Sequence, residues 1–333
     1  MDKVVFITGG SSGIGAATAR ALVSAGARVA LFARSAEKLE SLRDEISPSA
    51  LVFPGDVTVQ SDLNRAVDGT LARFGRIDAV LANAGQFAFE DLVTGDPDAW
   101  ARMVDVNING VLRTVRAVLP ALVDQGAGQV ILTASIAGRS VYPDSSIYAG
   151  TKHFLYGWAV GLRKQVQKHG ISVCVIAPGY VLNELWGETA GSSEQRAQVD
   201  AGVALTSEDI ADAIVFMLGR PAHVNIADML VLATRQEVPH ATTVFIDKWE
   251  ETRTLIRMYA TIMVERDGQK AIVIGSKGAM LKQIGTLARQ EMESLFGIHV
   301  FLDLHVKVES DWREKPAFLN ALDWRTMAGR DEN

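Results

Sequence analysis

The first 236 residues alternate between short apolar runs and stretches with the three- and four-residue spacing of a helix. The runs are apolar on nearly every residue, which is typical of strands in a sheet that is covered on both faces. Strands that alternate with helices in this way form a parallel sheet with helices on both sides. We therefore predict a doubly wound α/β fold with strands at residues 4–8, 28–32, 51–53, 79–82, 129–134, 171–176 and 229–232.

Length and composition limit what the chain can be. Its 333 residues, 48% of them hydrophobic, suffice for two folded domains, and we place these at residues 1–236 and 237–333. The formal net charge of −6 provides no overall positive field for nucleic acid. The single cysteine, Cys174, lies in an apolar run, so we expect a buried, inert thiol and a reducing, cytoplasmic compartment. Neither a signal-peptide pattern nor a run of roughly 18 apolar residues is present, so we expect no membrane association.

A glycine-rich turn follows the first predicted strand and opens the first predicted helix. Gly9, Gly13 and Gly15 allow a tight turn, close approach of a pyrophosphate, and close packing of the helix on the strand. The helix N-terminus adds unpaired N–H groups that favour an anion. A plain strand-to-helix connection also uses glycine and serine, but the position after an N-terminal strand favours a dinucleotide site. The residues that we expect at the cofactor are Gly9, Ser11, Ser12, Gly13, Ile14 and Gly15.

The end of the second predicted strand indicates which dinucleotide binds. Residues 31–35 place Arg34 at the strand tip and contain no acidic residue that could accept a hydrogen bond from a ribose 2′-hydroxyl. A guanidinium suits a 2′-phosphate, so Arg34 favours NADP over NAD. The alternative is that Arg34 is a solvated loop charge.

Tyr148 and Lys152 are four residues apart and share one face of a predicted helix. A phenol has a pKa of about 10, and a neighbouring ammonium stabilises the phenolate. We therefore expect Lys152 to lower the pKa of Tyr148 and make it usable for proton transfer. Ser135 can donate a hydrogen bond to a substrate oxygen. A single tyrosine on a helix is usually a core or surface residue, but the three residues together predict a hydride-transfer site beside the dinucleotide.

These motifs resemble those of the short-chain dehydrogenase/reductase family over residues 1 to about 236. The further matching positions are Asp56, Val57, Asn83, Ala84, Gly85, Asn107, Pro178, Gly179 and Val181. The resemblance implies a Rossmann-type sheet that binds NADP, with Asp56 and Val57 on the adenine side. It also implies a homotetramer that interconverts a small alcohol and its carbonyl.

The same resemblance implies roles for four residues. Tyr148 would be the catalytic acid/base, and Lys152 would lower its pKa and hold the nicotinamide ribose. Ser135 would orient the carbonyl, and Asn107 would support a proton relay through water. Asn183 stands where many members have a threonine that helps to hold the nicotinamide carboxamide, and an amide can also hydrogen-bond there. Residues 184–198 stand where the family keeps its substrate lid, and residues 221–236 are similar to the C-termini of members that act on 3-hydroxy acids and serine.

The remaining residues, 237–333, show a different pattern. Strands are predicted at residues 243–247, 254–264 and 300–308, a short helix at about 269–274 and an amphipathic helix at 280–296. Apolar and polar residues alternate in the last strand, so one face is expected to be buried. The loop between the helices holds two glycines, a lysine and a helix N-terminus directly behind it, which suits a nucleic-acid backbone. The alternative is a plain helix-to-helix connection with a solvated charged face.

This region resembles the C-terminal KH domain of the Era GTPase, through residues 237–240, 264–275 and 306–313. The resemblance implies a small α+β KH domain of type II that binds RNA, near the 3′ end of the small-subunit ribosomal RNA in that family. The residues that would hold the RNA are Gly275, Ser276, Lys277 and Gly278. The chain has no Gly-x4-Gly-Lys-Ser/Thr loop, so GTPase activity is not implied. The opening helix of this domain is replaced here, so we expect the dehydrogenase surface or an adjacent subunit to cover an apolar face.

Together these patterns predict an NADP-dependent oxidoreductase with an appended KH module whose expected ligand is RNA. One alternative is an RNA-binding or ribosome-associated protein whose Rossmann unit senses NADPH with little turnover, and another is an enzyme with an inert KH appendage. The intact set of Asn107, Ser135, Tyr148 and Lys152 argues against the first alternative. The six histidines have no metal-site spacing with cysteine or carboxylate, so no metal is expected.

Overall fold

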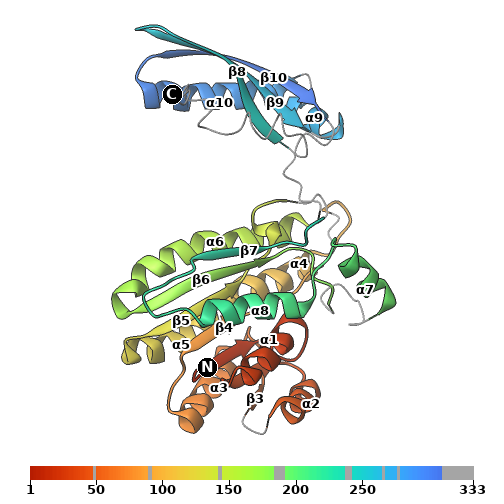
Figure 1. Ribbon diagram of the computed structural model, residues 1–333, viewed down its shortest axis with the longest axis vertical. Helices are drawn as coiled ribbons and strands as arrows, with labels where there is room; N and C mark the ends of the chain where they lie inside the picture. The colour runs from red at the N-terminus through yellow and green to blue at the C-terminus, as the bar shows by residue number, and fades with distance from the viewer. Residues whose placement is uncertain are drawn as a thin grey trace, which may run out of the picture. The chain divides into compact units, whose positions relative to one another are not determined.

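The computed structural model describes residues 1–47, 50–88, 92–141, 145–183, 192–236, 242–264, 267–275 and 278–309. The chain divides into two compact units, Met1–Glu237 and Val238–Asn333 (Figure 1). The described residues of the first unit contain a seven-stranded sheet, and those of the second contain a three-stranded sheet.

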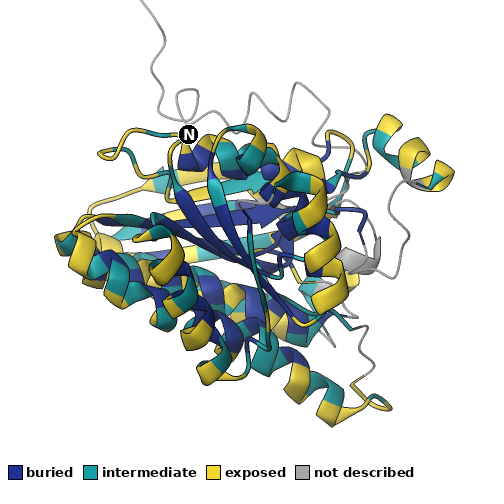
Figure 2. Cartoon of the chain, turned by 90° about the horizontal axis from the view of Figure 1, so that it is seen from below, coloured by how far each residue is buried: buried dark blue, intermediate teal, exposed yellow. Residues whose placement is uncertain are grey.

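The strands of the first sheet all run parallel, in the order β3-β2-β1-β4-β5-β6-β7. They are β1 Val4–Thr8, β2 Arg28–Ala33, β3 Leu51–Pro54, β4 Ala79–Ala82, β5 Gly128–Thr133, β6 Ile171–Pro178 and β7 Asp228–Val231. The central strands β1 and β4 are buried along their whole length, between helices that are exposed on their outer sides (Figure 2). The predicted doubly wound parallel sheet is confirmed, and the strand ends differ from the prediction by at most two residues.

Helices cover both faces of this sheet. One face is covered by α3 Gln60–Phe74, α5 Val111–Gln125 and α6 Ser146–Val166, and the other by α1 Gly13–Ser24, α2 Ala36–Ile46 and α8 Ser207–Leu218. Each face has its own cluster of buried apolar side chains, which includes Val115 and Leu155 on one side and Leu22 and Ile214 on the other. Two further helices, α4 Pro97–Val104 and α7 Ser193–Asp200, lie near the carboxyl edge of the sheet.

The helical stretch Pro97–Gln125 is long and apolar enough to cross a membrane by length and composition alone. A core helix of a water-soluble fold meets the same criterion. Val115, Val118 and Leu122 of this stretch are buried in the core cluster on one face of the sheet. The fold itself therefore uses the apolar side of this stretch.

The strand order reverses direction between β1 and β4. Strand β1 pairs with β2 on one side and with β4 on the other, so the loops that follow β1 and β4 lead to different layers. Such a divergence leaves a crevice at the carboxyl edge of the sheet. The glycine turn and the segment 83–85 both lie there, which is where the sequence predicts the cofactor.

The second unit has the elements β8 Thr242–Glu251, β9 Leu255–Val264, α9 Asp267–Ile274, α10 Ala279–Phe296 and β10 His299–Val308. The central strand β9 is antiparallel to β8 and parallel to β10, which confirms the predicted small α+β domain. Strand β8 is longer than predicted. A register shift between Ile246 and Lys248 sets Asp247 out of the pairing, and the strand continues beyond this bulge.

The apolar surface of this second unit is only partly covered. In β10, Val300 is buried and Phe301 is exposed, as the alternation predicts. Helix α10 has no buried residue, and Leu287 and Leu295 are 55% and 78% exposed. No helix precedes β8 within the described part of this unit. The expected cover by another surface stays a prediction.

Candidate active site

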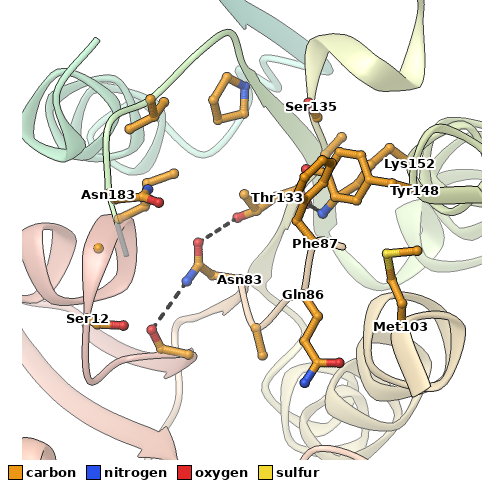
Figure 3. A pocket seen from close by; sticks show the side chains of 18 of the residues that line it. Ser12, Asn83, Gln86, Phe87, Met103, Thr133, Ser135, Tyr148, Lys152 and Asn183 are labelled. Atoms are coloured by element: carbon orange, nitrogen blue, oxygen red, sulfur yellow. Dashed lines mark hydrogen bonds between the residues drawn. The ribbon is translucent and has the colours of Figure 1, made fainter. Parts of the chain in front are cut away.

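A cavity of about 560 Å³ opens at the carboxyl edge of the parallel sheet (Figure 3). The loops after β1, β2, β4, β5 and β6 border it, together with helices α4 and α6. The predicted site residues that line it are Gly9, Ser12, Gly13, Ile14, Arg34, Asn83, Ala84, Gly85, Ser135, Tyr148, Lys152, Pro178, Gly179 and Val181. Segments that are far apart in the sequence therefore line the same cavity.

The glycine turn has no room for side chains at two positions. A Cβ on Gly15 would lie 2.1 Å from the carbonyl oxygen of Gly9, and one on Gly9 would lie 2.9 Å from Cα of Ala84. Gly9 and Gly13 also adopt positive φ angles of 66° and 49°. The N-terminus of α1 borders the cavity as a result. Of the predicted residues, Gly15 is used in packing, and Ser11 borders an adjoining cavity.

Asn83 ties the glycine turn to the neighbouring strands. Its side-chain nitrogen donates to the carbonyl oxygen of Gly9 at 3.4 Å, and its side-chain oxygen accepts from the Thr133 hydroxyl at 3.3 Å (Figure 3). Its backbone N–H donates to Oγ1 of Thr8 at 3.2 Å. These three bonds fix the loops after β1, β4 and β5 relative to one another.

Three of the residues predicted at the dinucleotide occupy different environments. Arg34 lines the cavity at the end of β2, and no ion pair within the described part of the chain involves it. Asp56 lies outside the cavity lining, where its side chain accepts hydrogen bonds from the backbone N–H and the hydroxyl of Thr58, both at 2.8 Å. Val57 is buried beside Gly110, where an added Cβ would lie 2.7 Å from its side chain. These contacts give Asp56 a role in the turn before α3 and Val57 a role in packing.

Ser135, Tyr148 and Lys152 lie together on the inner wall of the cavity. Ser135 follows β5, and the other two lie one turn apart on α6, as the spacing predicts. The side chain of Lys152 donates to the carbonyl oxygen of Thr133 at 3.0 Å and lies 5.6 Å from the ring centre of Tyr148. Phe87 meets the tyrosine ring edge-on at 5.0 Å. Only 5–9% of the surface of Ser135, Tyr148 and Lys152 is exposed.

Burial has the largest effect on the pKa values of Tyr148 and Lys152. It raises the pKa of Tyr148 to about 12, against the opposing effect of a hydrogen bond with Ser135. It lowers the pKa of Lys152 to about 8, because a buried ammonium loses its hydration. The expected lowering of the tyrosine pKa is therefore not found in this arrangement, since desolvation of the phenolate is the larger effect.

Asn107 lies in a π-helical turn, Asp105–Gly110, between α4 and α5. It is fully buried and does not line the cavity. Its side chain accepts from the backbone N–H of Gln86 at 2.7 Å and donates to the carbonyl oxygen of Gln86 at 2.9 Å and to the Thr151 hydroxyl at 3.2 Å. Asn107 thus joins the loop after β4 to the helix that carries Tyr148. π-helical turns of this kind often occur at functional sites.

The wall opposite the glycine turn contains residues that the sequence did not single out. Gln86, Phe87, Arg102 and Met103 line this side, and Figure 3 shows the first two and Met103 around Tyr148. Gln86 and Phe87 directly follow the segment 83–85, so their place could have been inferred from it. No such signal marked Arg102 and Met103, because nothing in the sequence predicted that α4 reaches the cavity.

The glycine loop of the second unit is described at its two ends. A Cβ on Gly275 would lie 2.6 Å from Cβ of Met280, so this position has no room for a side chain. Gly278 precedes α10 with a φ of 79°, and no atom lies within 4 Å of an added Cβ. The predicted Ser276 and Lys277 lie outside the described residues. Within the described residues, no group of three or more His, Cys, Asp or Glu side chains could hold a metal ion.

Comparison with known proteins agrees with this geometry. A family model for short chain dehydrogenases matches residues 3–193, and a KH domain model matches residues 237–313. The chain belongs to the short-chain dehydrogenase family and carries a KH domain, so the resemblances seen in the sequence are confirmed.

Relatives and solved structures extend this result. An uncharacterized oxidoreductase of Staphylococcus saprophyticus is 36% identical over 69% of this chain and 97% of its own length. An alcohol dehydrogenase from the archaeon Thermococcus sibiricus, complexed with 5-hydroxy-NADP, covers 72% of this chain and all of its own at 29% identity and a TM-score of 0.64. A serine dehydrogenase complexed with NADP⁺ covers 71% of this chain and 97% of its own at 28% identity and a TM-score of 0.65.

Proposed function

We propose that this protein is an NADP-dependent oxidoreductase that interconverts a small hydroxy compound and its carbonyl. The observation that carries the proposal is the group of Ser135, Tyr148 and Lys152, buried on the wall of the cavity that the glycine turn also borders. The same proposal includes a homotetramer, as the family resemblance implies, and a cytoplasmic location, as the single buried cysteine leads us to expect.

The residues around the cavity fit a dinucleotide. The tight glycine turn and the N-terminus of α1 would hold the pyrophosphate, because unpaired N–H groups at a helix start attract anions. Arg34 would hold the 2′-phosphate, since it lines the cavity and no ion pair with another described residue engages it. The similar structures that contain NADP⁺ and 5-hydroxy-NADP support this choice of cofactor.

The protein groups act on the oxygen atom of the substrate. The nicotinamide, when bound, supplies or accepts the hydride. In the reducing direction, the Tyr148 hydroxyl donates its proton to the carbonyl oxygen, and the raised pKa of about 12 keeps this proton in place at neutral pH. The Ser135 hydroxyl donates a hydrogen bond to the same oxygen and orients it. The Lys152 ammonium favours the phenolate that forms, because the two side chains lie close together and are largely buried.

The substrate side of the cavity favours a compound with an anionic group. Arg102 lines this wall, and no Asp or Glu side chain is among the described residues that line the cavity. Its ion pair with Asp96 is long, at 3.3 Å, and both side chains are mostly exposed, so a substrate carboxylate can replace it. Phe87 and Met103 supply apolar contacts. We therefore place small hydroxy acids first among the substrates, in keeping with the similarity to a serine dehydrogenase.

A test of the proposed reaction follows consumption of NADPH and of NADH at 340 nm with a panel of small keto acids, ketones and aldehydes. We expect turnover with NADPH and an acid substrate, and a loss of about 10²- to 10⁴-fold in the Tyr148→Phe variant. This variant should still bind NADPH, because it lacks only the hydroxyl. Binding of NADPH without turnover of any compound would favour the NADPH-sensing scaffold instead.

A second candidate function, binding of RNA, is favoured by the loop at Gly278. The space beside its Cα is open, so a nucleic-acid backbone can approach it closely. We would titrate a labelled RNA with the 3′-end sequence of small-subunit ribosomal RNA with the full chain and follow its anisotropy. Gly278→Asp should abolish binding, because it adds a side chain and a negative charge at this point. Equal binding by both proteins, or none by either, would contradict RNA recognition through this loop.

A further inference from the structure

The loop after β6 carries several residues of the cavity wall, and a later segment of the chain holds it in place. Pro178, Gly179 and Val181 line the cavity. The backbone N–H of Gly179 donates to the carbonyl oxygen of Val231, the last residue of β7, at 2.7 Å. The next backbone N–H, that of Tyr180, donates to the side-chain oxygen of Gln236 at 3.0 Å. Two successive amides of this loop therefore depend on residues 231–236.

The amide group of Gln236 lies directly against the backbone of the loop. A Cβ on Gly179 would lie 2.0 Å from the side-chain oxygen of Gln236, and 2.9 and 3.0 Å from its Cδ and Nε2. A side chain at position 179 would therefore displace the amide group of Gln236. Gln236 does not line the cavity, so it acts through the loop.

The same short segment also holds the chain that follows α7. The backbone N–H of Arg235 donates to the carbonyl oxygen of Gly202 at 2.7 Å, and Leu205 exchanges backbone hydrogen bonds with Tyr180 and Leu182 at 2.8 and 3.0 Å. The loop after β6 is thus clamped between residues 202–205 and Gln236. Residue 237, where the KH domain match begins, comes next in the chain.

We propose that Gln236 is a positioning residue that sets the loop at residues 178–181 for binding of the dinucleotide. The proposal rests on the proposed function, because it assumes that the cavity binds NADP. It also places a determinant of the dehydrogenase site at the junction with the KH domain. A side chain at the end of one unit would then be part of how that unit binds its cofactor.

Two isosteric variants of the full chain test this role. Gln236→Met keeps the length of the side chain but removes the acceptor, so the Tyr180 N–H loses its partner. We expect the Kd for NADPH, measured by fluorescence, to rise about fivefold or more, and the KM for NADPH to rise with it while kcat changes little. Gln236→Glu keeps an acceptor oxygen and should restore most of the affinity. The control is Arg235→Ala, which should leave the Kd for NADPH unchanged. The hydrogen bond of Arg235 to Gly202 is made by its backbone N–H, which alanine keeps.

Two insertions separate the position of Gln236 from the presence of the KH unit. Four residues, Gly-Ser-Gly-Ser, inserted after residue 236 leave Gln236 in place and should leave the Kd for NADPH unchanged. The same insertion after residue 235 displaces Gln236 and should raise the Kd as Gln236→Met does. Equal Kd values for the wild type and Gln236→Met, or equal effects of the two insertions, would overturn the role of Gln236. A wild-type protein that binds neither NADPH nor NADH would instead sink the proposed function.

Discussion

The two units differ in how far their helices are buried against their sheets. In the dehydrogenase unit, helices cover both faces of the sheet, and the strands β1 and β4 have no exposed residue. In the KH unit, α10 has no buried residue among its 18, and several large apolar side chains are half exposed or more. The helices on the two faces of the first sheet contribute buried side chains to its core, whereas α10 of the second unit leaves apolar side chains such as Leu295 exposed.

The difference extends to the candidate sites. The groups proposed for chemistry in the dehydrogenase unit are buried, and burial raises the pKa of Tyr148 to about 12 and lowers the pKa of Lys152 to about 8. The glycine loop of the KH unit instead leaves open space at Gly278. A site for proton transfer gains from the exclusion of water, and a site for a long polymer gains from access.

The largest effect on stability is expected for a substitution in the buried core of the dehydrogenase unit. Leu81 in β4 is fully buried, so Leu81→Ala removes methyl groups from a packed interior and should destabilise the dehydrogenase unit by about 2–5 kcal/mol. Urea unfolding followed by circular dichroism measures the change. A decrease in the free energy of unfolding well below 1 kcal/mol would mean that the core around Leu81 is not closely packed.

The pH dependence of reduction should follow Lys152. Its pKa of about 8 lies below the ordinary lysine value, so the ammonium is lost as the pH rises through 8. Tyr148, with a pKa of about 12, stays protonated over this range and cannot cause the change. We expect kcat/KM for carbonyl reduction to fall above pH 8 by up to about tenfold per pH unit.

The control for this profile is Lys152→Arg, which keeps its charge at high pH. The fall above pH 8 should disappear in this variant, even if its maximal rate is lower. A profile with the same fall in both proteins would assign the titration to another group.

Much of the architecture could be predicted because it is written in local patterns. The apolar runs predicted the strands, and the alternation in β10 predicted the face that contains the buried Val300. The cavity residues carried by sequence motifs, such as Tyr148 and Lys152, were also found. Contacts between distant segments could not be predicted from local patterns. The contact of Asn107 with Gln86 and that of Gln236 with the loop at Gly179 depend on the three-dimensional path of the chain. The expected lowering of the pKa of Tyr148 was wrong for the same reason, because burial is a property of the assembled fold.

A smaller effect is expected at the substrate wall. Arg102→Ala should lower kcat/KM for a keto acid about tenfold, because it removes the cation proposed to bind the carboxylate. The methyl ester of the same compound lacks the charge and should be affected by less than about twofold. The control is Arg113→Ala, since Arg113 also forms an ion pair with an aspartate, the partly buried pair with Asp105, and does not line the cavity. Equal losses for the acid and the ester would remove the assignment of Arg102 to the carboxylate.

The smallest effect is expected for the exposed apolar side chains of α10 in the KH unit. Leu287 is 55% exposed, so Leu287→Ser should change the free energy of unfolding of the KH unit by less than about 0.5 kcal/mol. Urea unfolding of the full chain, compared with the Leu81→Ala protein, measures both units under one condition. A loss of about 1 kcal/mol or more would mean that another surface buries this side chain, as we expect from the sequence, in which the opening helix of the KH domain is replaced. If that loss also depended on protein concentration, the covering surface would belong to a second copy of the chain.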